Sequence, residues 1–192
     1  MIFSIIMVSI LLMSVASFAL FYNQSTGGSS STTNYNNYKF VYTEEGWKTS
    51  IKTGQGQYYI ATKYLPEDVE SINYLGSPIV KSDFQSIVYF VAKTDIERAA
   101  ANEIDKNLFA QKKEIACLPE EANESACYNM TIKSCENANY LQKIIVFDET
   151  ENENETSIIY SNNCLRIKGN QYNLIKAADK TVFIIFDIIK TQ

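Results

Sequence analysis

Histidine is absent from this chain of 192 residues. Its absence excludes Ser-His-Asp and Cys-His nucleophile systems, histidine zinc sites and histidine-based pH switches. Any proton transfer or covalent catalysis would have to depend on carboxylates, lysine or tyrosine.

The common catalytic and phosphate-binding motifs are absent as well. The chain contains no G-x-S-x-G, S-x-x-K, Walker A or G-x-G-x-x-G sequence, and its cysteines form no C-x-x-C. Gly54 and Gly56 lack the third glycine and the following helix of a dinucleotide-binding loop, so a turn explains them better. The sequence therefore assigns no catalytic residue, no cofactor and no metal.

Charged side chains are absent from residues 1–38. As a helix, residues 2–22 would be about 31 Å long, which matches a hydrocarbon core of roughly 30 Å. We predict a transmembrane anchor at 1–22. The alternative is a secretory signal with small-residue processing sites at 15–17 or 17–19. The length of the apolar run and the lack of a basic residue before it favour the anchor.

Residues 23–37 consist of Gln, Ser, Thr, Gly and Asn with one tyrosine, a composition typical of a flexible polar tether. Such a coil reaches about 20 Å. The alternative is an ordered loop packed on the domain. The first basic side chain is Lys39, so the positive-inside rule favours a cytoplasmic N-terminus. The sequence thus predicts a single-pass membrane protein with one extracytoplasmic domain at 38–192.

This domain carries every charged side chain, 17 basic and 22 acidic, and therefore the whole net charge of −5. An acidic domain repels phosphate backbones, so we do not expect nucleic acid as a partner. The expected contact with the membrane is made by the N-terminal helix. The length of the domain suits a single hydrophobic core.

All four cysteines, Cys117, Cys127, Cys135 and Cys164, belong to the predicted extracytoplasmic domain. In an oxidising location, two structural disulfides are the expected arrangement. Three pairings exist. We favour Cys117 with Cys127, which closes a short loop, and Cys135 with Cys164, which joins that region to a later strand. Four free thiols that bind a metal are the alternative.

The first part of the domain predicts a three-stranded antiparallel meander. Residues 38–43, 47–53 and 57–64 are rich in aromatic and β-branched residues, and glycine-containing turns separate them. In the middle segment Trp47 and Ile51 share one face while lysines share the other, so one face should be buried. A short helical turn should follow, with a proline at its first position.

The middle of the domain predicts a strand, a helix and another strand. Residues 84–93 contain a continuous apolar run typical of a buried strand. Thr94 and Glu97 form a capping box, which begins a helix that should run to about residue 111 with Phe109 beside its apolar face. Residues 114–118 follow as a strand. This order predicts a βαβ crossover.

The last third predicts three strands and a helix. The strands are expected at 143–147, 157–161 and 164–168, and the helix at 172–189. Residues 119–139 are rich in cysteine and asparagine and should be irregular. The predicted fold class is therefore α/β (mixed α+β): an N-terminal antiparallel meander joined to a mixed sheet with two main helices, preceded by one transmembrane helix.

Two local patterns suggest ligands. Residues 148–155 are strongly acidic, but Glu153 stands where a calcium loop needs glycine and Ile159 where it needs a bidentate glutamate. A solvated hairpin loop is the simpler interpretation, and weak cation binding is the alternative.

Four N-x-S/T sequons begin at Asn23, Asn123, Asn129 and Asn154. Chance predicts roughly three in a chain of this composition, so their number indicates no selection. Their positions in the tether and in loops would permit glycosylation outside the cytoplasm.

Aromatic residues and a few acids are the remaining candidates for binding or chemistry. The aromatic residues of the predicted meander could contact a protein or glycan partner, although strand and core packing is their commoner role; they are Tyr38, Tyr42, Trp47, Tyr58, Tyr59 and Tyr64. Asp95 is expected to cap its helix. Asp179 is expected to face solvent beside Lys180. A glycosidase-like mechanism would need two carboxylates across a cleft.

The order of several features resembles a known group of sequences: a hydrophobic N-terminus and polar tether, then Gly46-Trp47, the four cysteines, Gly169 and Ala177-Ala178-Asp179. The chain is similar in this order to uncharacterised archaeal single-pass membrane-anchored extracytoplasmic proteins. The resemblance covers most of the predicted extracytoplasmic domain and implies no activity, cofactor or partner.

Three functional hypotheses follow. The first is a non-catalytic, membrane-anchored surface domain with a role in binding or envelope assembly. The second is a pilin-like filament subunit, against which the glycine- and serine-rich tether argues, because a pilin helix would continue into its head. The third is an exported carboxylate-dependent hydrolase, which requires a cleft with two converging acids and a raised pKa in one of them.

Overall fold

The computed structural model describes residues 31–53, 56–152 and 155–191. Its contacts divide the chain into two units, Met1–Ser31 and Thr32–Gln192, and the second unit is described here. The predicted anchor at 1–22 and most of the predicted tether lie outside the described residues. Among the described helices, none has the length and apolar character needed to cross a membrane.

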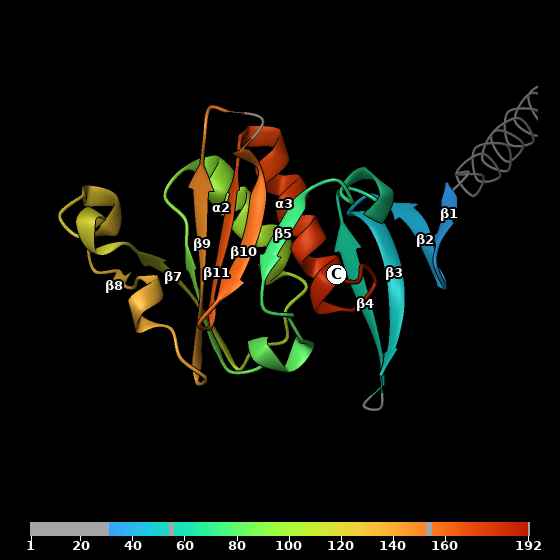
Figure 1. Cartoon of the computed structure of the whole chain (residues 1–192), viewed down its shortest axis with the longest axis horizontal. Helices are drawn as coiled ribbons and strands as arrows, with labels where there is room; N and C mark the ends of the chain where they lie inside the picture. The colour runs from blue at the N-terminus through green and yellow to red at the C-terminus, as the bar shows by residue number, and fades with distance from the viewer. Residues whose placement is uncertain (1–30, 54–55, 153–154, 192) are drawn as a thin grey trace, which may run out of the picture. The chain divides into compact units, whose positions relative to one another are not determined.

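The N-terminal part of this unit is a four-stranded antiparallel meander (Figure 1). Its strands, in sheet order, are β1 (Thr32–Tyr35), β2 (Tyr38–Thr43), β3 (Gly46–Thr53) and β4 (Gly56–Thr62). The three predicted antiparallel strands are confirmed as β2, β3 and β4, whereas β1 was not expected. Burial alternates along β3 as expected, with Thr49 and Ile51 buried.

One correction concerns the tether, which the sequence places at 23–37. Its last part instead forms β1 and a turn, and β1 pairs with β2 from Thr32 opposite Val41 to Tyr35 opposite Tyr38. Asn36 adopts a left-handed conformation in this turn. A polar composition suggested a coil, but an edge strand needs few apolar residues because its neighbour supplies the hydrogen bonds.

The larger sheet has seven strands in the order β5-β10-β11-β9-β6-β7-β8. Their bounds are β5 (Asn73–Gly76), β6 (Ile87–Val91), β7 (Lys112–Cys117), β8 (Thr131–Ile132), β9 (Gln142–Glu149), β10 (Ser157–Ser161) and β11 (Cys164–Gly169). Strands β11, β9, β6, β7 and β8 are mutually parallel, whereas β10 is antiparallel to β11 and parallel to β5. The mixed sheet and the β6-α2-β7 crossover are confirmed.

The larger sheet differs from expectation in three places, of which the first is β8, a strand within residues 119–139, where irregular structure was expected. Strand β5 has no recognisable apolar alternation, and it forms because β10 offers it a parallel partner. Phe84, expected at the start of the buried strand, belongs instead to a short 3₁₀ helix and is itself buried. The tight turn between β10 and β11 places Asn162 and Asn163 in the left-handed region, as a type I′ hairpin requires.

Two α-helices are described, α2 (Asp95–Asp105) and α3 (Gln171–Ile185). Both are shorter than predicted. Helix α2 ends before Asn107 because the amide of that residue bonds both backbone groups of Ala61 in β4, at 2.9 and 2.8 Å. Phe109 consequently lies outside the helix, half exposed, rather than beside its apolar face.

Helix α3 ends in a Schellman-type cap. Asp187 has a φ of 60°, and the amide of Ile188 donates to the carbonyl of Phe183 at 2.8 Å. The described residues also include five single-turn 3₁₀ helices: η1 (Pro66–Asp68), η2 (Lys81–Phe84), η3 (Pro119–Glu121), η4 (Ser125–Cys127) and η5 (Cys135–Asn137). The turn expected at Pro66 is η1.

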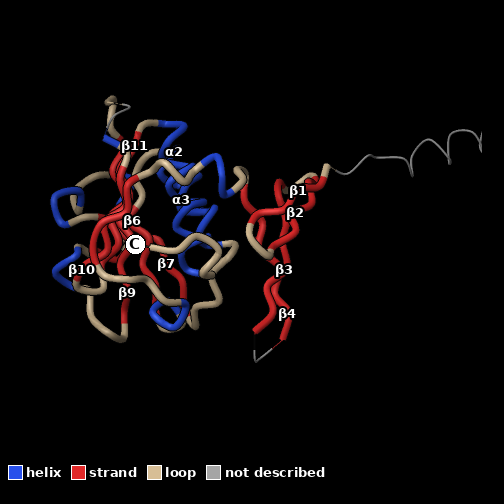
Figure 2. Tube along the Cα trace, turned by 45° about the vertical axis from the view of Figure 1, so that its right-hand side comes forward, coloured by secondary structure: helices blue, strands red, loops and turns tan. Residues whose placement is uncertain are grey.

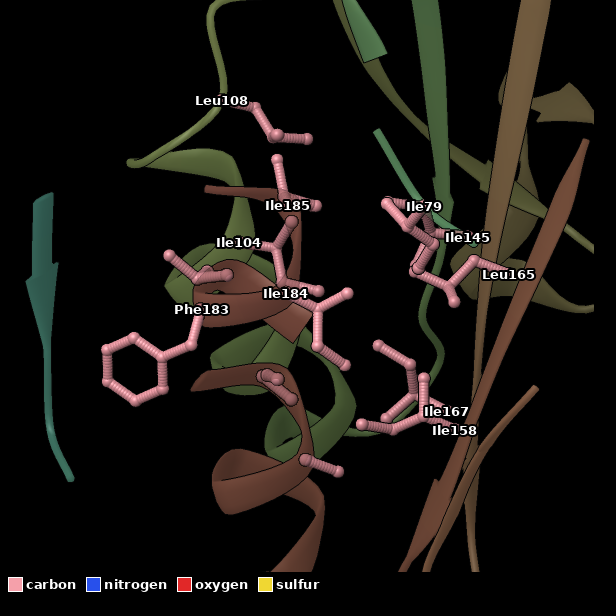
Figure 3. Close-up of a cluster of buried hydrophobic side chains, with 14 of the residues drawn as sticks. Ile79, Ile104, Leu108, Ile145, Ile158, Leu165, Ile167, Phe183, Ile184 and Ile185 are labelled. Atoms are coloured by element: carbon pink, nitrogen blue, oxygen red, sulfur yellow. The ribbon is translucent and has the colours of Figure 1, made fainter. Parts of the chain in front are cut away.

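The main hydrophobic core lies between the two sheets, where α2 and α3 are packed (Figure 2). Figure 3 shows Ile145, Leu165 and Ile167 of the larger sheet on one side of the helices. On the other side Phe183 of α3 is directed toward the meander, where its ring meets Phe40 edge to face at 6.0 Å. Helix α3 therefore supplies apolar side chains to both sheets, which accounts for its β-branched composition.

The second face of the larger sheet is covered differently. A smaller cluster that includes Tyr89, Ile144 and Val146 packs against Leu118, Cys135 and Ala138 of the irregular segment 118–140. This covering segment contains no described α-helix. Two disulfides hold it.

Candidate functional site

The disulfides have the pairing that the sequence analysis favours. Cys117 bonds Cys127 with Cα atoms 5.9 Å apart, and Cys135 bonds Cys164 with Cα atoms 5.3 Å apart. No cysteine is free, and all four lie among the described residues. Because structural disulfides form and persist in oxidising compartments, the two disulfides suggest a location outside the cytoplasm. They also engage the sulfur atoms that a thiolate metal site would need.

The cavity of greatest interest, about 610 Å³ in volume, lies at the carboxyl ends of the parallel strands. Strands β6, β9 and β11 run in the same direction, so their carboxyl ends meet at the edge toward which the β9 arrow points in Figure 1. The chain leaves β6 toward β7 and leaves β9 toward β10, on the opposite side. Ligands of open α/β sheets characteristically bind at such a switch point.

We call this cavity the crevice. Each of the three strand ends contributes residues to it. Thr94 and Glu97 follow β6, residues 149–151 end and follow β9, and Asn170, Gln171 and Tyr172 follow β11. Gly169 permits the direct passage from β11 into α3, because a Cβ there would lie 3.0 Å from the amide nitrogen of Leu174.

The floor of the crevice is held by a buried carboxylate. Glu97 accepts hydrogen bonds from the amides of Lys93 at 2.6 Å and Thr94 at 3.0 Å, and from the amide of Glu149 at 3.1 Å. It therefore completes the predicted capping box and also joins the end of β6 to β9. With its oxygens so engaged and only 7% of the residue exposed, Glu97 is a positioning group.

The two helix N-termini at the crevice are capped by their own side chains. The hydroxyl of Thr94 accepts from the amide of Glu97 at 3.2 Å and donates to the carboxylate of Glu149 at 2.9 Å. The side chain of Asn170 accepts from the amide of Asn173 at 3.1 Å. With the carboxylates of Glu149 and Glu151 beside these caps, the crevice favours a neutral or cationic ligand over an anion.

The exposed side chains of the crevice combine hydrogen-bonding groups with an aromatic ring. Glu149 and Glu151 offer carboxylate acceptors, Gln171 offers an amide, and the ring of Tyr172 is 73% exposed. Carboxylates and amides can bond adjacent hydroxyl groups, and a tyrosine ring offers a flat apolar surface. Of these four residues, only Glu149 and Glu151 are candidates for ligand binding from the sequence alone, as part of an acidic loop. The position of all four residues at or just after the ends of parallel strands was the sequence signal that could have identified Gln171 and Tyr172 as well.

The acidic stretch 148–155 is only partly the loop that was expected. Asp148 and Glu149 belong to β9, where Asp148 is 3.4 Å from the guanidinium of Arg166. Glu155 pairs with Lys168, and this pair lowers the pKa of the Glu155 carboxyl. Several acids of this stretch thus have specific partners.

Asp179 contradicts the expectation of a solvent-facing acid. It is fully buried, and its Oδ2 accepts from the amides of Lys63 and Tyr64 at 2.8 and 2.9 Å. Burial raises the pKa of this carboxyl from 3.8 to about 7, against the two amide bonds that lower it. Asp179 does not line the crevice, so its role is to fix the end of β4 to α3.

The aromatic residues of the meander do not form a common platform. Tyr38, Trp47 and Tyr64 pack against the main core, while Tyr59 is 67% exposed on the opposite face. The ring of Tyr58 lies beneath the ammonium of Lys81, 4.2 Å from its centroid. The aromatic residues that could have formed a binding surface are thus divided between core and solvent, in line with the commoner packing role.

The predicted glycosylation sites that lie among the described residues are exposed. Asn123 and Asn129 lie at the surface of the disulfide-bonded segment. Asn154 and Asn23 lie outside the described residues. Glycosylation of these sites stays a prediction.

Comparison with known proteins provides no relative: no family model matches the chain, and neither the curated sequences nor the solved structures contain a significant match.

Proposed function

We propose that the chain is a membrane-anchored, extracytoplasmic binding domain that recognises a glycan in the crevice at the carboxyl ends of β6, β9 and β11. The observation that carries the proposal is the position of this crevice at the switch point of the sheet, with Glu149, Glu151, Gln171 and Tyr172 around it. The role is binding rather than catalysis.

Electrostatics and geometry support a hydroxyl-rich, uncharged ligand. The acids at the crevice disfavour anions, and the capped helix N-termini have their first amides partly satisfied. Carboxylate and amide oxygens accept hydrogen bonds from hydroxyl groups, and the exposed ring of Tyr172 suits the apolar face of a sugar.

A hydrolase is less well supported, because neither of the two buried acids, Glu97 and Asp179, is placed to act on a ligand in the crevice. Glu97 is engaged by three backbone amides and cannot serve as a mobile proton donor. Asp179 has a raised pKa but is sealed from the crevice. A pilin-like subunit is also less well supported, because the described unit begins with the strand β1 rather than with a continuing helix.

The location rests on two arguments. The apolar, uncharged residues 1–22 suit a bilayer, and the two disulfides require an oxidising compartment. Non-reducing mass spectrometry of the chain extracted from membranes would report anchor retention and cysteine pairing together. Detection of a cleaved chain would refute the proposed anchor, and detection of four free thiols would refute the proposed extracytoplasmic location.

Binding is tested with the full chain in detergent on an array of neutral and N-acetylated oligosaccharides. We expect a subset to bind, and Tyr172→Ala and Glu149→Gln each to weaken that binding about tenfold. Tyr128→Ala and Glu136→Gln are matched controls, because both residues are exposed and lie outside the crevice. An array without any bound glycan, or equal losses in the controls, would refute the proposal.

A further inference from the structure

A second cavity, of about 560 Å³, lies apart from the crevice. Three segments meet there: the β1–β2 turn with Tyr35 and Asn36, residues 70–74, which lead from η1 into β5, and α3 with the chain that follows it. Its walls combine apolar and polar groups. Ile72, Ile184 and Ile189 supply the apolar part.

A buried lysine faces this cavity. Lys180 lines it and is only 6% exposed, and its Nζ donates to the carbonyls of Glu70 at 2.7 Å and Ile72 at 2.6 Å. Its place beside Asp179 in the sequence predicts a solvent-exposed side chain. The two neighbours instead point into different surroundings, Asp179 toward β4 and Lys180 toward residues 70–72.

The charge of Lys180 has no ion-pair partner among the described residues. The nearby Glu70 carboxylate accepts instead from the hydroxyl of Tyr35. Lysine is rarely buried unless it is paired, because an uncompensated charge in a low dielectric is costly. Burial lowers the pKa of Lys180, and Glu70 only partly opposes this.

One donor of Lys180 remains for a ligand. An ammonium group has three hydrogens, and two of them are directed to the carbonyls of Glu70 and Ile72. Two further donors at the cavity are already engaged: the hydroxyl of Tyr74 donates to the carbonyl of Ser77, and the side-chain amide of Asn36 donates to the carbonyl of Ile188 at 3.3 Å. At the rim, Lys190 pairs with Asp187.

We propose that this cavity binds a small carboxylate with an apolar tail, its carboxylate on the ammonium of Lys180 and its tail against Ile72, Ile184 and Ile189. A monoanion suits the site better than a phosphate dianion. The cavity offers one unpaired cationic donor, contains the Glu70 carboxylate, and lies beside the last turn of α3, where the helix dipole is negative.

Two consequences follow from such binding. The bound carboxylate would supply the missing countercharge and raise the pKa of Lys180 toward its ordinary value. It would also contact two of the three segments, residues 70–74 and α3 with the chain that follows it, so its binding would stabilise the folded unit increasingly as the ligand concentration rises. This site is independent of the glycan crevice, and neither proposal depends on the other.

The test uses the full chain in detergent with ¹⁵N-labelled lysine. The Lys180 Nζ resonance and the melting temperature are followed during titration with 3-methylbutanoate, 3-methylbutylamine or inorganic phosphate. We expect a saturable shift of that resonance and a rise in melting temperature with the carboxylate alone. No shift with the carboxylate, or an equal response to the amine or to phosphate, would overturn the proposal.

Two variants locate the binding. Lys180→Met keeps the aliphatic stem but removes the charge and should weaken carboxylate binding about tenfold or more. Lys176→Met is the matched control, one turn earlier on α3 with its ammonium over the ring of Tyr64 at 5.2 Å, and should bind as the unaltered chain does. Unchanged binding by folded Lys180→Met would contradict the proposal. The titration of the unaltered chain decides the matter if that variant does not fold.

Discussion

The two faces of the seven-stranded sheet are covered in different ways. One face packs against α2 and α3 through a large apolar core that continues to the meander. The other face has a smaller apolar cluster, beneath an irregular segment that both disulfides hold. Helices with apolar stripes bury enough surface to stay in place, whereas a short polar segment does not, and covalent links replace the missing burial.

Adjacent isoleucines of β9 offer the most direct test of this difference, and the largest expected effect. Ile145 faces the helices and Ile144 faces the disulfide-bonded segment, and both are fully buried. We expect Ile145→Ala to cost about 4 kcal/mol and Ile144→Ala about 2 kcal/mol in unfolding free energy, because the irregular segment can collapse into the space left. Denaturant unfolding measures both, and equal or reversed costs would contradict the comparison.

The buried carboxyl of Asp179 sharpens the account of the helix-covered side. Its pKa of about 7 in the folded chain exceeds the ordinary 3.8, so the folded state binds the extra proton. The contribution of this group to stability is therefore complete below about pH 4 and is lost as the pH rises toward 7 and above, by an amount on the order of 4 kcal/mol.

Asp179→Asn is the matched variant, because its side-chain oxygen can still accept from Lys63 and Tyr64 while it does not titrate. Subtracting its unfolding free energy from that of the unaltered chain at several pH values isolates this carboxyl. A difference that stays constant between pH 4 and pH 8 would show that Asp179 does not have the raised pKa.

On the other side, the longer disulfide should matter slightly less than the core isoleucine. Replacing Cys135 and Cys164 together by serine should cost about 3 kcal/mol, mainly by releasing a constraint on the unfolded chain. Hydrogen exchange should quicken in residues 118–140 and remain slow in α2 and α3. Uniformly faster exchange throughout the described unit would show that the two faces are not stabilised separately.

Local patterns predicted most individual elements correctly. Alternating aromatic and β-branched residues indicated β2, β3 and β4, and Thr94 with Glu97 indicated the start of α2. Errors arose where distant partners act. Helix α2 ends early because Asn107 bonds β4, and β5 exists because β10 pairs with it.

The candidate sites were harder to anticipate than the elements. Nothing in the residues around Asp179 and Lys180 distinguishes two buried charges from a solvent-exposed pair. Their burial arises because α3 lies between two sheets, a position that gives one neighbour the amides of β4 and the other the carbonyls of residues 70–72. A helix that packs against a sheet on both sides exposes neither of these faces to solvent.

The amino-acid sequence was sufficient to establish which reactions lack their residues, where strands and helix caps begin, and that every charged side chain follows residue 38. Tertiary packing alone decided that β9 lies between β6 and β11, and so brought Thr94, Glu149 and Asn170 to one crevice. The reason is physical: capping and alternation act over a few residues, whereas strand order minimises the free energy of the whole core.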